Sequence, residues 1–196
     1  MNQFKETLPE NITLKTVFNQ SESVSHRVSG FFANLLQGII LVGIVIFSAV
    51  SWRAALIVMT VIPVSILMGI FGLDLSNYGL QQMSIVGFVI ALGLLVDNAI
   101  VVTDNIARYM RKGFSREEAA VKGTSEVGTA VVSATATTVF AFIPIILIQS
   151  ITGDFIRSMP ITVVYTLTAS LLLSLTFTPY LSSKFLHINH NHKQHN

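Results

Sequence analysis

Long apolar stretches separated by short polar connections dominate this chain from residue 30 onward. Five stretches each hold about 20 residues, the length that an α-helix needs to cross the hydrocarbon core of a bilayer. They cover residues 30–50, 54–73, 82–102, 127–148 and 160–181. The pattern predicts an all-α fold, a polytopic membrane bundle of about five transmembrane helices. The short connections predict that neighbouring helices are antiparallel.

The polar segments define the expected domain organisation. Residues 1–29 are expected to form a polar extracytoplasmic stretch, and residues 30–182 the helix bundle with a cytoplasmic connector at 103–126. Residues 183–196 form a polar cytoplasmic tail. We expect no metal site in this tail, because neither a carboxylate nor a cysteine accompanies its histidines. They are His187, His190, His192 and His195.

Composition supports the membrane interpretation. Hydrophobic residues make up 52% of the chain and charged residues 11%, which is too little charge to cover a soluble domain of this size. The basic residues lie beside the apolar stretches, where they act as topology signals, so the net charge of +2 indicates no nucleic-acid site. The absence of cysteine removes disulfides, thiolate metal sites and cysteine nucleophiles from consideration.

The distribution of Lys and Arg predicts the orientation. The connection after the third stretch is rich in basic residues and is expected to be cytoplasmic, whereas residues 74–81 carry none and are expected outside. Residues 1–29 would then also lie outside, although they contain no export signal. We therefore expect the chain to be a segment of a larger membrane protein. The basic residues are Arg108, Arg111, Lys112, Arg116 and Lys122.

Asp97 is the one charged side chain deep within any of the five stretches. A carboxylate at a helix centre costs roughly 2.5–3.5 kcal/mol on insertion scales, so such residues usually face a bundle interior or a water-filled cavity. They commonly serve in ion or proton pathways. The alternative is a structural hydrogen bond to a neighbouring helix.

Two further patterns concern the fourth stretch and the connector before it. Ser115 and Glu118 have the capping-box spacing, which predicts a short helix over residues 116–122 that Gly123 ends. Small and hydroxyl residues recur at helical spacing on the third and fourth stretches. We expect these residues to pack the two helices together, or to line a proton path where they neighbour Asp97. They are Gly87, Ala91 and Asn98 on the third stretch and Thr129, Ser133 and Thr137 on the fourth.

A family resemblance is carried by several segments in one order. They read GLDLSNYGLQQMSIVGFVIALGLLVDNAIVVTDNIAR, GFSREEAAVKGTSEV, TTVFAFIPIILIQSITGDFIR and SLTFTPYLSS. Over roughly residues 51–183 the chain resembles the N-terminal half of a resistance-nodulation-division efflux transporter. It would correspond to helices two to six of that half.

The resemblance implies a proton-driven antiporter of the bacterial inner membrane, with twelve helices in two similar halves. Such transporters usually form trimers that meet a periplasmic adaptor and an outer-membrane channel. The family signature often has two adjacent acids, whereas this chain has Asp97 followed by Asn98, so the proton load should fall on Asp97. Asp104 matches a position that is commonly acidic, although it could equally be a solvated end residue or a partner of Arg108. Without the rest of the transporter, the segment should not pump.

Two other classes remain as alternatives. A non-transporting scaffold or sterol-sensing-like module of the same superfamily would explain the helix bundle equally well. An intramembrane aspartyl protease needs two converging carboxylates, and only Asp97 lies deep in a stretch. We therefore expect a transporter segment and not an enzyme, with no cofactor.

Overall fold

The structure is a computed structural model that describes residues 52–76 and 78–186, together with scattered positions between 29 and 47. The regular elements with defined bounds in this part of the chain are all helices, and the all-α prediction is confirmed. They are α3 (Trp52–Leu75), α4 (Gln82–Arg111), α5 (Arg116–Ile146), α6 (Ile151–Ile156) and α7 (Ser158–Phe185).

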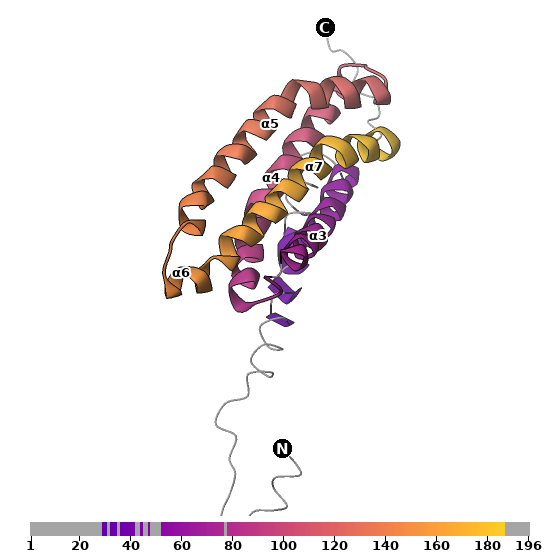
Figure 1. Cartoon of the computed structure of the whole chain (residues 1–196). Helices are drawn as coiled ribbons and strands as arrows, with labels where there is room; N and C mark the ends of the chain where they lie inside the picture. The colour runs from indigo at the N-terminus through magenta and orange to yellow at the C-terminus, as the bar shows by residue number, and fades with distance from the viewer. Residues whose placement is uncertain are drawn as a thin grey trace, which may run out of the picture.

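Four of these helices, α3, α4, α5 and α7, are long and apolar enough to cross a membrane. α3, α4 and α7 contain the expected spans that begin at residues 54, 82 and 160, and α5 contains the span that begins at residue 127 except for its last two residues. Successive long helices run antiparallel (Figure 1). The expected first span, residues 30–50, falls largely outside the described residues. Residues 1–28 of the polar stretch before it and the four histidines of the tail also lie outside them.

The connection between α4 and α5 is shorter than expected, because both helices continue past their apolar stretches. Only residues 112–115 lie between the two helices. The capping box is confirmed: the Glu118 backbone N–H donates to Ser115 Oγ at 3.3 Å, and the Ser115 N–H donates to Glu118 Oε2 at 3.4 Å. These bonds satisfy backbone donors that the first turn of α5 would otherwise leave free.

The separate short helix expected over residues 116–122 is wrong, since α5 continues without a break through Gly123. Gly123 instead permits close packing of α5 on α4, because a Cβ there would lie 2.9 Å from Ile106 Cα. A glycine costs a helix about 1 kcal/mol relative to alanine. Close packing against α4 offsets that cost, and this contact is invisible in the sequence.

α7 is the central helix of the bundle and contacts α3, α4 and α5 (Figure 1). Large apolar side chains on α3, α4 and α7 are fully buried, among them Ile62, Phe88 and Leu167. Gly87 of α4 is also buried, and a Cβ at this position would lie 2.6 Å from the Met159 carbonyl oxygen of α7. α4 and α7 are therefore in close backbone contact at this level.

The connection between α5 and α7 contains the short helix α6. Ser150 caps α6, because its Oγ accepts a hydrogen bond from the Gly153 N–H at 2.9 Å. Arg157 follows the helix, and its Nη2 donates to the Ile148 carbonyl oxygen at 3.0 Å. These local bonds order a helix of only six residues, which is too short to be recognised from periodicity.

Candidate functional site

Asp97 lies in the middle of α4 with an exposed side chain. No hydrogen bond or ion pair joins its carboxylate to another residue of the described part. The sequence predicted a bundle interior or a water-filled cavity around this residue. Among the helices that the structure describes, Asp97 instead lies on the outside, so any interior around it would need further protein.

Other exposed residues recur along α4 every three or four positions, in register with Asp97. This spacing places them on one side of the helix, which we call the α4 face. Asp97 is surrounded along this face by residues without charge, and a second carboxylate, Asp104, lies near the C-terminal end of α4. The α4 face consists of Val86, Ile90, Gly93, Asp97, Val101 and Asp104.

Asn98, the residue next to Asp97, lies on a buried side of α4 and is 8% exposed. Thr135 Oγ1 of α5 donates a hydrogen bond to Asn98 Oδ1 at 3.2 Å. The Asn98 Nδ2 atom is buried and has no partner among the described residues. Asn98 therefore links α4 to α5 and does not share a face with the carboxylate of Asp97.

A polar cluster joins the C-terminal part of α4 to the first turns of α5. Asn105 Nδ2 donates to the Gly123 carbonyl oxygen at 2.7 Å and to Glu126 Oε2 at 2.8 Å. Arg108 Nη2 also donates to Glu126 Oε2, at 2.7 Å. Arg108 is thus paired with Glu126 and not with Asp104, which rules out one of the two alternatives that the sequence left open for Asp104.

Asp104 lies on the exposed side of this cluster. Its Oδ1 is 3.9 Å from Arg111 Nη2, and the two side chains are 54% and 50% exposed. An ion pair this long and this exposed contributes little to stability. Asp104 thus resembles a solvated end residue more closely than a group held in an apolar site.

The small and hydroxyl residues expected to join the third and fourth spans occupy different surroundings. Gly87 and Ala91 are buried, and Gly87 packs against α7, whereas Thr129, Ser133 and Thr137 are exposed on α5. The described polar contacts from α5 to α4 come from Thr135, Gly123 and Glu126. A part for the three exposed hydroxyls in proton transfer stays a prediction.

A row of buried hydroxyl side chains along α7 is a feature that the hydropathy pattern does not reveal. Its members recur at every fourth residue and are each at most 1% exposed. One of them, Ser170, donates through Oγ to the Leu95 carbonyl oxygen of α4 at 3.0 Å, two residues before Asp97. Small hydroxyls let helices approach closely in lipid, so the row forms a packing seam. It consists of Ser158, Thr162, Thr166, Ser170, Ser174, Thr178 and Ser182.

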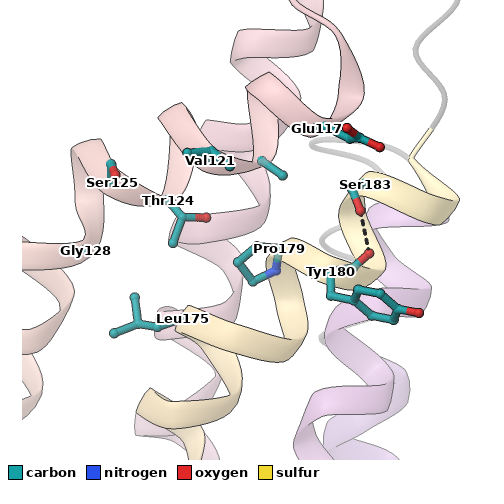
Figure 2. A pocket seen from close by; sticks show the side chains of 10 residues that line it. Glu117, Val121, Thr124, Ser125, Gly128, Leu175, Pro179, Tyr180 and Ser183 are labelled. Carbon is teal, nitrogen blue, oxygen red and sulfur yellow. Dashed lines mark hydrogen bonds between the residues drawn. The ribbon is translucent and has the colours of Figure 1, made fainter.

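Two pockets flank the C-terminal part of α7, and neither is lined by Asp97. The α5–α7 pocket has a volume of about 560 Å³ and is shown in Figure 2. Glu117 is the one charged residue among those that line it. The α3–α7 pocket, of about 660 Å³, has Arg53 and Lys184 in its walls. The described residues contain no group of three or more His, Cys, Asp or Glu side chains that could hold a metal ion.

These features define a polytopic α-helical membrane protein with a carboxylate on the outer face of one spanning helix. The chain belongs to the AcrB/AcrD/AcrF family of resistance-nodulation-division transporters, because the family model matches residues 1–196. The family resemblance expected from the sequence is thus confirmed.

Relatives in several bacteria support the same conclusion. The chain is 32% identical over 187 residues to multidrug resistance protein MdtC of Pectobacterium atrosepticum, a match that covers 95% of this chain and 18% of the relative. It is 34% identical over 178 residues to MdtC of Escherichia coli, which covers 90% of this chain and 17% of the relative. The chain therefore spans less than a fifth of the length of these relatives.

Proposed function

We propose that this chain is part of the membrane domain of a proton-driven efflux transporter and that Asp97 carries the proton. The observation that carries the proposal is the placement of this carboxylate, exposed in the middle of an apolar spanning helix. A lipid-facing carboxylate costs several kcal/mol. Cover by another part of the parent transporter removes that cost and gives Asp97 an enclosed site.

Proton coupling needs a site with two environments. A carboxylic acid among apolar groups holds its proton, and one that approaches a cation releases it. No Lys or Arg lies within residues 82–102, and the family resemblance places the usual cation in the other half of the transporter. The α4 face is then the surface that meets the second half, and movement between the halves alternates the surroundings of Asp97.

The neighbours of Asp97 have supporting parts in this proposal. Asn98 replaces the second acid of the family signature, so one carboxylate carries the proton while Asn98 holds α4 against Thr135 of α5. Ser170 fixes the backbone of α4 next to the site through the Leu95 carbonyl oxygen. Asp104 is a solvent-exposed residue nearer the basic end of the helix, and it contributes less to proton transfer than Asp97 does.

The assembly and its cargo follow the family pattern in this proposal. The parent transporter resides in the bacterial inner membrane, forms a homotrimer and connects through a periplasmic adaptor to an outer-membrane channel. The relatives are named multidrug resistance proteins, so amphiphilic drugs are the first substrates to test. Because the chain covers less than a fifth of such proteins, it should not transport by itself.

Substrate-dependent proton flux tests the transport function. The complete transporter containing this segment would be placed in liposomes that carry a pH gradient and an internal pH dye. An amphiphilic dye substrate should collapse the gradient severalfold faster than in empty liposomes, because each exported molecule is exchanged for protons. Proton leakage that substrate leaves unchanged would instead favour the non-transporting scaffold.

The orientation of the bundle gives a separate prediction. The chain contains no cysteine, so single cysteines at Leu80 and Lys112 can be labelled selectively. Both positions are exposed in connections at opposite ends of α4. We expect a membrane-impermeant thiol reagent to label the Leu80→Cys variant on intact cells and the Lys112→Cys variant only after the membrane is opened. The reverse pattern would contradict the proposed orientation.

A further inference from the structure

The α3–α7 pocket combines an apolar interior with cationic walls. It lies between the beginning of α3 and the end of α7, at the end of the bundle that also holds the basic connection between α4 and α5. Leu56, Ile57, Phe177 and Leu181 supply apolar surface. The volume of about 660 Å³ is within the range of roughly 300–1,000 Å³ found for small-ligand sites.

Two cations face this pocket, and none of the described residues that line it is acidic. Arg53 comes from α3 and Lys184 from α7. Arg53 Nη1 is buried and has no hydrogen-bond partner among the described residues. A buried guanidinium N–H without an acceptor is costly, so a ligand oxygen at this point would be stabilising.

Aromatic rings hold both cations beside the pocket. The Arg53 guanidinium lies 5.3 Å from the ring centroid of Trp52, and Lys184 Nζ lies 5.3 Å from that of Tyr180. Trp52 is 54% exposed and lines the pocket as well. Exposed tryptophan together with basic side chains is typical of the headgroup level of a membrane. The cations and the apolar interior therefore match the two parts of a lipid.

We propose that the α3–α7 pocket binds an anionic phospholipid. Its phosphate lies between Arg53 and Lys184, and the first part of an acyl chain lies along Leu56, Ile57 and Leu181. Basic pockets between membrane helices on the cytoplasmic side bind anionic lipid headgroups by this combination of charge and apolar contact. The site depends on membrane embedding and on these side chains, and it is independent of Asp97 and of proton coupling.

The α5–α7 pocket shows why this proposal concerns only one side of α7. That pocket has a similar volume and lies at the same end of the helix, but Glu117 is its one charged lining residue (Figure 2). A negative phosphate there would meet a carboxylate instead of two cations. Both pockets use residues of α7 but differ in the charge of their walls. We therefore expect the anionic lipid in the α3–α7 pocket and not in the α5–α7 pocket.

Trp52 provides a direct measurement, because it is the single tryptophan of the chain and lines the pocket. The purified 196-residue chain would be reconstituted with increasing amounts of bromine-labelled lipid, which quenches tryptophan on contact. We expect half-maximal quenching at about a tenfold lower mole fraction of phosphatidylglycerol than of phosphatidylcholine, since each cation near the surface favours the anionic lipid. Equal quenching by the two lipids would overturn the proposal.

Matched variants separate the pocket from general surface charge. The Arg53→Gln/Lys184→Gln variant should lose the preference for phosphatidylglycerol. The Arg111→Gln/Lys112→Gln variant removes the same charge from exposed positions outside the pocket and should keep it. A preference that survives the first variant, or that disappears equally in both, would overturn the proposal. Circular dichroism would check that helix content is retained.

A third variant tests whether lipid occupies the apolar interior of the α3–α7 pocket. It also keeps the proposal testable if the Arg53→Gln/Lys184→Gln variant misfolds. Thr60 lines the pocket with an exposed side chain, so Thr60→Phe fills space without removing charge. We expect Thr60→Phe to weaken quenching by phosphatidylglycerol severalfold. Unchanged quenching would contradict occupation of the pocket.

A competition experiment distinguishes a lipid site from a site for soluble anions. Inorganic phosphate at a concentration equal to that of the lipid should not reduce quenching by phosphatidylglycerol. Full competition would indicate a soluble-anion site instead of a lipid site.

Discussion

Replacing Asp97 with asparagine should reduce energy-coupled export by the complete transporter at least 100-fold, close to background. The amide keeps the size and shape of the side chain but cannot bind and release a proton, so the driving ion is lost. Because Asp97 is exposed and has no partner within the described part, the change should leave folding intact. Drug efflux from cells and substrate-induced proton flux would be measured at matched expression.

Two neighbouring variants serve as controls for this result. Asn98→Ala removes the bond from Thr135 and should lower export only severalfold, because the carboxylate remains. Asp104→Asn should have a smaller effect still, since that side chain is 54% exposed and its ion pair is long. Full activity of the Asp97 variant would remove the central claim. A loss confined to Asp104→Asn would move the proton site toward the basic end of α4.

The spanning helices were predictable because their signal is local. A run of about 20 apolar residues has few alternatives in a membrane, and the four described spans agree with that expectation. The cap at Ser115 was equally local, as it depends on a residue three positions away. The helix ends were not predictable in this way, because hydropathy marks where lipid contact ends and not where the helix ends.

Contacts between helices explain most of what the sequence did not predict. In the sequence, Gly123 indicates the end of a helix. The nearby backbone of Ile106 on α4 shows that it instead permits close packing of the two helices. The spacing of Arg108 and Asp104 along α4 allows an ion pair, but Arg108 is paired with Glu126 of α5. The hydroxyl row of α7 is visible as a four-residue repeat, yet α3, α4 and α5 must be in place before it becomes a buried seam.

The sequence predicted which residue forms the candidate proton site, but not where its side chain lies. Charge within an apolar stretch identified Asp97, but the direction of its side chain depends on how α4 packs. α4 buries the side that meets α7 and α5, and this rotation leaves Asp97 on the α4 face. Asn98, next in sequence, is turned inward by the same rotation. Helical geometry thus gives the two residues of the family signature separate surroundings.

The contact between α4 and α7 should depend strongly on Gly87. A Cβ at this position would lie 2.6 Å from the Met159 carbonyl oxygen and 2.8 Å from Thr162 Cβ, so any larger residue must push the two backbones apart. Overpacking of a tight core typically costs about 1–3 kcal/mol, and Gly87→Leu should reach or exceed the upper value because the obstacle is partly backbone.

Gly93→Leu is the matched control for this variant, because both glycines lie on α4. Gly93 is exposed on the α4 face, and no heavy atom lies within 4 Å of a Cβ built there. In thermal unfolding of the detergent-solubilised chain, followed by circular dichroism, Gly87→Leu should lower Tm by roughly 6–12 °C and Gly93→Leu by no more than about 2 °C. Similar losses in both variants would show that glycine is needed for reasons other than contact with α7. An unchanged Tm for Gly87→Leu would contradict the close packing of α4 and α7.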